Sequence, residues 1–329
     1  MTTITKSSMT ELLSPVRDGL KAVEDRMRDY VPDQHEALTA AINHLLASGG
    51  KRIRPAMSLL AAGIFGADSD EAVSVAASIE MLHTATLVHD DLIDGSLLRR
   101  GIPTLNANWN AGATVLTGDY IFARAADLAA QANSVRVMRI FARTLMILVN
   151  GEINQMFKSR GMASRDDYYR RIYAKTASVF EAATEAGAVV GRATEDEISA
   201  LAECGRQVGS AFQIVDDILD FVGDSAHIGK PVGGDLRQGL VTLPALYFLE
   251  EHPNHPDLRA LLNGHMGDAA ITARVVEAVS NSGAIRASLN EARDFANRGL
   301  AALDTLRSPA GPYADSLRGL ADYVVSRDL

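Results

Sequence analysis

The stretch Glu71–Asp94, with the sequence EAVSVAASIEMLHTATLVHDDLID, decides the fold of this 329-residue chain. Small and apolar residues fill most of its positions, so a helix formed here is apolar around most of its circumference. Such a helix is buried in the middle of a helical bundle. Its last five residues have the pattern Asp-Asp-x-x-Asp, and the same pattern returns as Asp216-Asp217-Ile218-Leu219-Asp220. The sequence therefore predicts two helices that carry carboxylates beside an apolar core.

Most other long segments also show the helical period, and none alternates as a strand. The Pro/Gly/Ser-rich stretches are too short for a domain linker, and no unit of 20–50 residues repeats. A glycine-rich loop is expected at 223–239. We predict an all-α chain, residues 1–329 forming one domain, as a bundle of roughly ten or more helices. Besides the opening stretch, the predicted helices cover 10–30, 33–46, 57–65, 112–130, 134–157, 166–191, 195–221, 268–282, 285–306 and 313–326.

Composition limits the function classes. The formal net charge of −9 argues against a nucleic-acid binder. Cys204 is the only cysteine, so neither a disulfide framework nor a thiolate metal cluster is predicted. The polar N-terminus lacks the apolar core of a signal peptide, and no stretch is long and apolar enough to span a membrane. We expect a cytoplasmic protein without stable membrane insertion.

The aspartate pattern predicts a metal site. On a helix its first and fifth residues lie one turn apart on one face, so two carboxylates stand side by side. Crowded carboxylates repel one another unless a cation joins them, and Mg²⁺ commonly bridges carboxylates to substrate phosphates. A solvated acidic helix face is the alternative. Two copies, each near a basic segment (Arg99-Arg100-Gly101 and Gly229-Lys230-Pro231), favour a metal–diphosphate site.

A third basic segment, Gly49-Gly50-Lys51-Arg52-Ile53-Arg54-Pro55, combines glycines with three cations beside a helix start. It lacks the spacing of a P-loop. A solvated basic turn is the alternative to a second anion-binding site.

Together these segments resemble the trans-type isoprenyl (polyprenyl) diphosphate synthases. The resemblance covers almost the whole chain, in the expected order. Besides the segments quoted above, it includes His83–His89, Thr117-Gly118-Asp119-Tyr120, Asn150-Gly151-Glu152, Lys175-Thr176-Ala177, Phe212-Gln213 and Gly234-Asp235-Leu236. It implies the isoprenoid synthase fold, with helices around a central apolar cavity. It also implies Mg²⁺, about three ions in each active site, which Mn²⁺ can replace.

The resemblance further implies a head-to-tail condensation of isopentenyl diphosphate with an allylic diphosphate, farnesyl or geranylgeranyl diphosphate. The implied metal ligands are Asp90, Asp94 and Asp216, with Asp91, Asp217 and Asp220 as supporting carboxylates. The implied allylic diphosphate residues are Arg99, Lys175, Thr176, Gln213 and Lys230. The implied isopentenyl diphosphate residues are Lys51, Arg54, His83 and Arg100. Many relatives carry a lysine at the position of Leu240, so no role is assigned to that residue.

Small residues before the first motif bear on product length. Relatives that make short products carry an aromatic residue one turn before the first aspartate, where this chain has Ala85 and Thr86. Met81 and Leu82 follow two turns back. A helix of about 24 residues is about 36 Å long, which leaves room for many isoprene units. The pattern most resembles octaprenyl to decaprenyl synthases for quinone side chains.

Several alternatives remain open. They are a shorter-chain farnesyl or geranylgeranyl synthase, the catalytic subunit of a heterodimer, a terpene cyclase and a non-catalytic partner subunit. The resemblance implies a homodimer, and the apolar product implies transient membrane contact on release.

Overall fold

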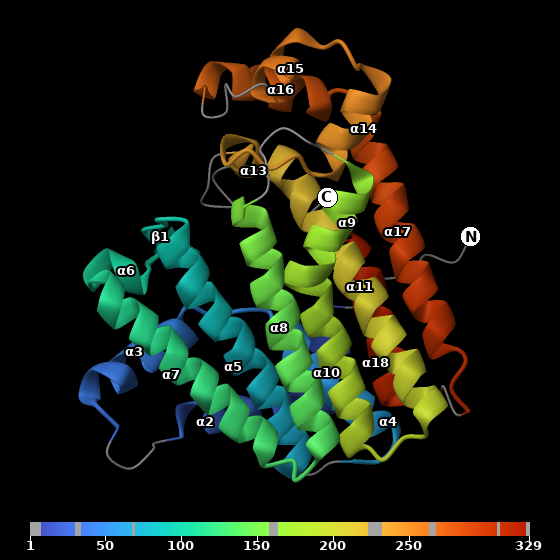
Figure 1. The fold of residues 1–329 in the computed structure, drawn as a ribbon. Coiled ribbons are helices and arrows are strands. Elements are labelled where there is room, and N and C mark those ends of the chain that lie inside the picture. Colours follow the sequence, from blue (N-terminus) through green and yellow to red (C-terminus); the bar gives the residue numbers. More distant parts are fainter. Residues whose placement is uncertain are drawn as a thin grey trace. The chain divides into compact units, whose positions relative to one another are not determined.

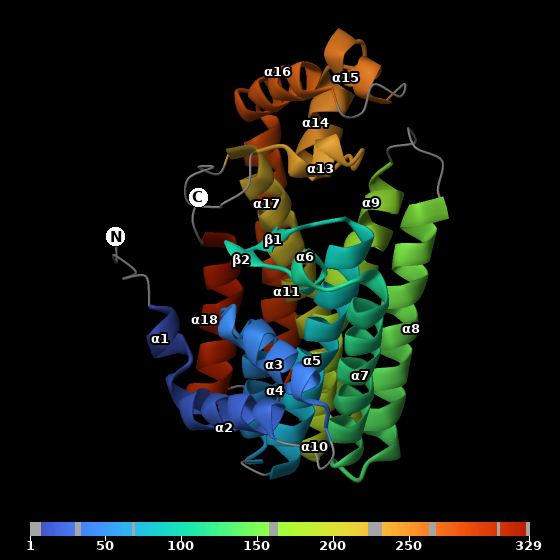
Figure 2. The ribbon, with the colours of Figure 1, turned by 90° about the vertical axis from the view of Figure 1, so that its left-hand side faces the viewer.

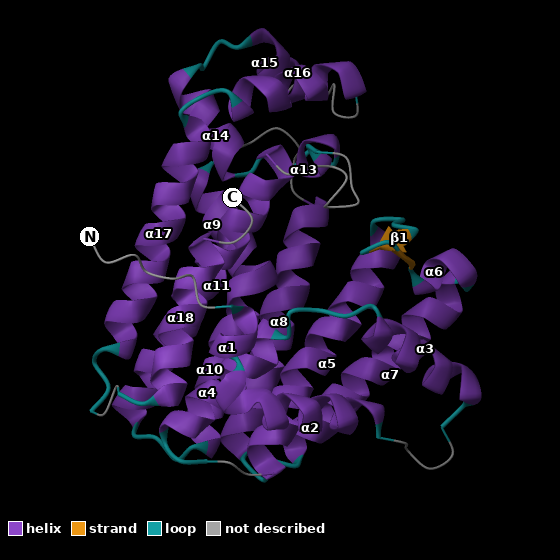
Figure 3. Ribbon diagram, turned by 180° about the vertical axis from the view of Figure 1, so that it is seen from behind, coloured by secondary structure: helices purple, strands orange, loops and turns teal. Residues whose placement is uncertain are grey.

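The computed structural model describes residues 8–29, 34–67, 70–157, 164–222, 232–262, 268–307 and 310–326. Within these ranges the chain is almost entirely helical, as predicted (Figures 1 and 3). A short 3₁₀ turn, η1 (Ser14–Val16), and a π-helical turn, η2 (Tyr173–Ala177), accompany the α-helices. The α-helices are α1 (Met9–Leu12), α2 (Arg17–Arg28), α3 (Glu36–Ala47), α4 (Ile53–Ile64), α5 (Asp70–Ile93), α6 (Leu105–Asn108), α7 (Ala111–Ala130), α8 (Val135–Phe157), α9 (Arg165–Ile172), α10 (Ser178–Val190), α11 (Glu195–Val222), α13 (Gly234–Arg237), α14 (Leu243–Glu251), α15 (Pro256–Leu262), α16 (Ala269–Ser280), α17 (Ala284–Leu303) and α18 (Pro312–Ser326).

Residue contacts group the chain into two compact units. The first comprises Met1–Leu145, Val179–Gly205 and Ala302–Gly319, and the second comprises Met146–Ser178, Arg206–Ala301 and Leu320–Leu329. Unit boundaries fall inside α8, α11, α17 and α18. Domain boundaries normally lie in exposed linkers, so one domain remains our prediction for residues 1–329.

In the first unit, α5 is the buried helix that its composition predicts. It packs along α7 and also against α4 and α2 (Figure 1). Its residues from Ser74 to Leu82 are all buried. The Ser78 hydroxyl donates a 2.7 Å hydrogen bond to the Ala125 carbonyl of α7, which satisfies a polar group inside this contact. The contact between α5 and α7 fixes the helix that carries the first aspartate motif.

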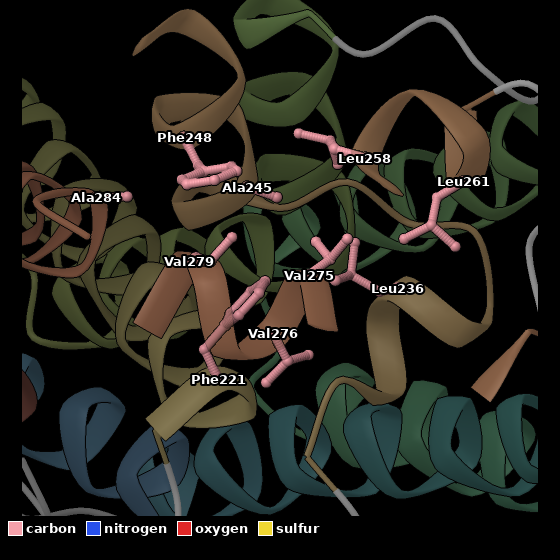
Figure 4. Packing of buried hydrophobic residues seen from close by; sticks show 10 residues of the cluster. All are labelled: Phe221, Leu236, Ala245, Phe248, Leu258, Leu261, Val275, Val276, Val279 and Ala284. Atoms are coloured by element: carbon pink, nitrogen blue, oxygen red, sulfur yellow. The ribbon is translucent and has the colours of Figure 1, made fainter. Parts of the chain in front are cut away.

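In the second unit, the C-terminal end of α11 lies in a packed apolar cluster. Figure 4 shows Phe221, from this end of α11, among side chains of α13 to α17. The buried members of the cluster are Phe221, Leu236, Ala245, Phe248, Leu258, Leu261, Val275, Val276, Val279 and Ala284. A second cluster joins Tyr168 and Ile172 of α9 to Ile214, Val215 and Ile218 of α11. Residues of α11 just before the second aspartate motif and just after it are thus both packed in apolar clusters.

The structure differs from the sequence prediction in several places. Where one helix was expected over 10–30, the described part of that range is divided into α1, η1 and α2. No strand alternation is visible in the sequence, yet the two-residue strand β1 (Leu98–Arg99) pairs antiparallel with β2 (Ile102–Pro103) after α5 (Figure 2). The glycine-rich segment 223–239, expected as a loop throughout, includes the short helix α13. The single helix expected over 166–191 contains the π-helical turn η2 between α9 and α10.

Among the described residues, no helix has the length and apolar character needed to cross a membrane.

Candidate active site

The first aspartate motif lies at the C-terminal end of α5, and its last residue, Asp94, directly follows the helix. Asp94 is exposed and Asp90 is partly buried, whereas Asp91 is only 5% exposed. The Asp94 N–H donates to the Asp90 carbonyl at 2.8 Å, so these two residues lie one helical turn apart. Gly95, with φ of +64°, then ends the helix, and the Ser96 N–H donates to the Asp91 carbonyl at 2.9 Å. The motif is therefore held at a well-defined helix terminus.

The β1–β2 hairpin directs the two arginines that follow this motif. Its two-residue turn is Arg100-Gly101, with φ of +52° and +77°, the positive values that a type I′ turn requires. Arg99, on β1, donates to Asp91 from Nε at 2.9 Å and from Nη2 at 2.8 Å. Arg100 in the turn donates instead to the Gly49 carbonyl. Adjacent arginines thus go to different places, one to the aspartate motif and one to the basic segment.

Within the basic segment 49–55, Arg52 forms ion pairs inside the first unit. Arg52, at φ of +48° before α4, pairs with the buried Glu80 of α5 at 2.8 Å and with Glu24 at 3.1 Å. Lys51 is exposed. The Arg54 guanidinium lies over the Phe180 ring, 4.9 Å from its centroid. Glu80 was not among the predicted site residues, although an isolated acidic residue in an apolar helix indicates a buried partner.

His83 lies on α5 among these cations. Burial lowers the pKa of its imidazole well below 6.5, and the positive charges of Arg54, Arg100, Arg99 and Arg52 lower it further. A neutral imidazole surrounded by guanidinium groups can donate one hydrogen bond to an anion without adding charge. The electrostatics in this part of the first unit therefore fit an anionic ligand.

The second motif, on α11, shows the same division between its aspartates. Asp216 is partly buried, whereas Asp217 is 4% exposed and accepts hydrogen bonds from the Tyr168 hydroxyl at 2.7 Å and from Gln213 Nε2 at 2.9 Å. Asp220 accepts the backbone N–H groups of Gly234 at 3.0 Å and Asp235 at 3.1 Å. The carboxylates of Asp217 and Asp220 thus have protein partners within the second unit.

The π-helical turn η2 carries Lys175 and Thr176. Lys175 Nζ lies 3.0 Å from Glu152 Oε1 of α8. The Thr176 hydroxyl donates to Gln213 Oε1 at 2.6 Å, which links this turn to α11. A π-helical turn inside a helix frequently marks a functional site, because the extra residue redirects the side chains of one turn. Here the redirected turn is the one that carries the predicted diphosphate lysine.

Clustered carboxylates in the second unit favour a cation. Burial raises the pKa of Asp235 to about 6, and the charges of Asp220 and Asp216 act in the same direction. Burial also raises the pKa of Asp217 well above its usual value, and Asp235 adds to this. Oxygen ligands of this kind suit Mg²⁺. Among the described residues, no three His, Cys, Asp or Glu side chains form a metal site by themselves.

The predicted chain-length residues lie in the core of the first unit. Met81, Leu82 and Ala85 are buried and Thr86 is partly buried. The Thr86 hydroxyl donates to the His83 carbonyl at 2.7 Å, so its methyl group is left to contact neighbouring side chains. Because Ala85 is fully buried, a larger side chain at this position must displace neighbouring atoms. The location of these residues on α5 is compatible with the predicted tunnel, and their role stays a prediction.

The predicted site residues divide between the two units. The first unit holds Lys51, Arg54, Met81, Leu82, His83, Ala85, Thr86, Asp90, Asp91, Asp94, Arg99 and Arg100. The second unit holds Lys175, Thr176, Gln213, Asp216, Asp217 and Asp220. Lys230, with its neighbours Gly229 and Pro231, lies outside the described residues.

Comparison with known proteins identifies relatives along the whole chain. The polyprenyl synthetase family model matches residues 35–279. The heptaprenyl diphosphate synthase component 2 of Geobacillus stearothermophilus is 39% identical over 318 residues, covering 96% of this chain and 98% of that protein.

Two solved structures are similar over nearly their full length. A polyprenyl synthase from Caulobacter crescentus CB15, complexed with calcium and isoprenyl diphosphate, has a TM-score of 0.89 and 36% identity, covering 99% of both chains. A decaprenyl diphosphate synthase from Rhodobacter capsulatus has a TM-score of 0.88 and 35% identity, covering 97% of this chain and 99% of its own.

Proposed function

The chain belongs to the polyprenyl synthetase family and is a prenyltransferase, and we propose that it makes a long-chain all-trans polyprenyl diphosphate. It would do so by Mg²⁺-dependent condensation of isopentenyl diphosphate with farnesyl or geranylgeranyl diphosphate. One observation carries the proposal of a metal–diphosphate site. In each motif the second aspartate is buried and engaged by protein partners, while the first aspartate is more exposed. The same arrangement in both motifs suits a metal site in which the first aspartate binds the ion and the buried second aspartate helps to orient the site.

In this proposal the two motifs act on one allylic diphosphate. Asp90, Asp94 and Asp216 are the direct Mg²⁺ ligands. When bound, Mg²⁺ neutralises the diphosphate so that the allylic C–O bond can break. Arg99, Lys175 and Lys230 add positive charge, with Thr176 and Gln213 as hydrogen-bonding neighbours. The support for Arg99 is its fixed orientation on Asp91.

Isopentenyl diphosphate is assigned to Lys51, Arg54, Arg100 and His83. This group contains cations and a neutral imidazole but no carboxylate, so its diphosphate would bind without metal and would not ionise. The double bond of isopentenyl diphosphate then attacks the allylic cation, forming the new C–C bond. The proton lost from the product passes to the departing diphosphate.

A long product is supported by two facts. Ala85 and Thr86 are small at the place where an aromatic side chain would block a tunnel. The names of similar proteins include heptaprenyl and decaprenyl diphosphate synthases. We infer that such a product supplies the side chain of a quinone.

The decisive experiment gives the purified chain farnesyl diphosphate, isopentenyl diphosphate and Mg²⁺, with mass spectrometry of the products. Prenyl diphosphates of seven to ten isoprene units, lost when EDTA replaces Mg²⁺, are expected. Products that stop at geranylgeranyl diphosphate would select the shorter-chain alternative. A cyclic hydrocarbon would select a terpene cyclase.

A heteromeric enzyme is the second candidate, because one similar protein is named as a component of its synthase.

An exposed apolar stripe on α8 offers a contact surface: Met146, Val149, Ile153, Met156 and Phe157 are between 45% and 85% exposed. We propose that a second copy of this chain covers it, giving a homodimer. Turnover by the isolated chain, with a dimer mass in light scattering, supports this. Inactivity of the isolated chain points to a missing partner.

A further inference from the structure

A chain of hydrogen bonds in the second unit starts at a residue that has no assigned role. Tyr168 of α9 is 1% exposed, and its hydroxyl donates to Asp217 Oδ2 at 2.7 Å. The other oxygen, Asp217 Oδ1, accepts from Gln213 Nε2 at 2.9 Å. The Gln213 side-chain oxygen in turn accepts from the Thr176 hydroxyl at 2.6 Å. The chain therefore runs from α9 through α11 to the π-helical turn.

We propose that Tyr168 is a positioning residue for metal and allylic diphosphate binding. It holds the Asp217 carboxylate, whose backbone neighbour is Asp216. Through Gln213 it also orients Thr176, and with it the turn that carries Lys175. This inference rests on the proposed function, which assigns Asp216 to the metal and Lys175 to the diphosphate.

Packing around Tyr168 gives its hydroxyl a fixed position. The Tyr169 ring meets the Tyr168 ring edge-on, with 5.4 Å between the two centroids. The Arg171 guanidinium lies over the Tyr168 ring, 5.6 Å from the centroid of that ring. Arg171 also donates to the Val241 carbonyl at 2.9 Å, which anchors that guanidinium. A ring enclosed in this way cannot rotate its hydroxyl elsewhere.

Loss of this hydroxyl affects the metal-binding side of α11 through Asp217. The buried carboxylate would keep only Gln213 among these two donors, and a buried acceptor that loses a partner is strongly disfavoured. The carboxylate and Gln213 would then shift, and Thr176 and Lys175 would shift with them. Residues that orient metal ligands from behind typically change metal affinity or activity by about 10- to 100-fold when substituted.

The next residue provides a matched control. Tyr169 also donates its hydroxyl to a carboxylate, Glu291 of α17. Glu291 keeps other donors, Tyr247 at 2.6 Å and Arg165 at 3.1 Å. Its described hydrogen bonds do not include either aspartate motif. Tyr169→Phe therefore removes the same chemical group from the same helix without touching the chain described above.

The experiment compares Tyr168→Phe, Tyr169→Phe and the wild-type chain. Calorimetry measures binding of inorganic diphosphate in the presence of Mg²⁺, and steady-state kinetics separate KM for the allylic diphosphate from KM for isopentenyl diphosphate. Tyr168→Phe should weaken Mg²⁺-dependent diphosphate binding and raise the allylic KM by about tenfold. Its KM for isopentenyl diphosphate, and all values for Tyr169→Phe, should stay within about twofold of wild type.

A double-mutant cycle tests the route of the effect. If Tyr168 acts through Asp217, then Tyr168→Phe should add little to Asp217→Asn in diphosphate binding. Fully additive effects, or equal losses for both substrates, would overturn the inference, as would wild-type binding by Tyr168→Phe. Circular dichroism checks that each variant is folded. Failure of the wild-type chain to transfer prenyl groups would instead refute the proposed function, so the two failures are distinguishable.

Discussion

Arg99 donates hydrogen bonds to both carboxylate oxygens of Asp91, from Nε to Oδ2 at 2.9 Å and from Nη2 to Oδ1 at 2.8 Å. This bidentate pair joins the hairpin to the helix end that carries the first motif. Asp91 is only 5% exposed, so the pair is shielded from water on the aspartate side. We infer that Asp91 acts on substrate chiefly by fixing the direction of Arg99.

Asp91→Asn should therefore raise KM for the allylic diphosphate by about tenfold, because the neutral amide keeps only one acceptor oxygen for Arg99. Asp70→Asn is the control, since Asp70 pairs with Arg26 at the opposite end of the same helix. Steady-state kinetics with varied allylic diphosphate give the values. Equal KM values for the two variants would contradict this role for Asp91.

Glu80→Gln should reduce both stability and affinity for isopentenyl diphosphate. Glu80 is the buried partner of Arg52, and removing one charge of a buried pair typically costs about 3 kcal/mol. Arg52 lies between Lys51 and Arg54 in the sequence, so a shift of Arg52 should displace both neighbours. KM for isopentenyl diphosphate should therefore rise. Urea unfolding and kinetics measure the two effects.

Glu24→Gln provides the comparison for Glu80→Gln. Glu24 contacts the same arginine, but its side chain is 38% exposed. An ion pair of this kind contributes about 1 kcal/mol or less. If both variants lose equal stability, the burial argument fails.

A graded series at Ala85 should shorten the product in steps. Ala85 is fully buried on α5, so Val, Leu and Phe at this position would fill progressively more of the predicted tunnel. Overpacking is expected to reduce the unfolding free energy by about 1–3 kcal/mol, so thermal unfolding accompanies the product analysis. Mass spectrometry of the prenyl products gives the lengths. An unchanged distribution in a folded Ala85→Phe variant would show that this part of α5 does not line the tunnel.

His83 should make the protein less stable in mild acid. Its pKa lies well below 6.5 in the folded protein, because of burial and the surrounding arginines, so below pH 6.5 only the unfolded chain takes up the proton. The unfolding free energy therefore falls as the pH drops below 6.5, by up to about 1.4 kcal/mol per pH unit until the folded pKa is reached. His83→Gln should show a shallower fall in urea unfolding between pH 6.5 and 5. The same slope in both proteins would exclude this contribution.

Residues 1–329 should unfold as one domain. The boundaries between the two contact units fall inside continuous helices such as α8 and α11 rather than in linkers. Calorimetric and van't Hoff enthalpies of unfolding should then agree. Two resolved transitions would mean that the units unfold separately.

The sequence predicted the features that depend on long periodic patterns. The stretch 71–94 has an apolar pattern that persists over several turns, and the structure forms α5 there. The hairpin escaped prediction because its strands have two residues each, too short for any alternation to be visible. The turn Arg100-Gly101 was the available signal, since glycine accepts the positive φ that such a turn needs.

The site was predictable in its residue types and not in its internal contacts. The paired aspartate motifs indicate a metal, but nothing in the spacing shows that Asp91 contacts Arg99 or that Asp217 contacts Tyr168. The first contact depends on the hairpin that follows α5. The second depends on how α9 packs against α11, and its two residues are 49 positions apart in the sequence. The π-helical turn at Lys175 is equally hidden, because its residues carry no special signature.

Asp220 determines where the short helix α13 begins. Its backbone carbonyl accepts the Gly233 N–H at 2.7 Å, and its carboxylate accepts the N–H groups of Gly234 and Asp235. One residue therefore fastens the chain on both sides of 223–231, and α13 begins at a point set by that residue. Asp220 therefore ties the start of α13 to the end of α11, which carries the second aspartate motif.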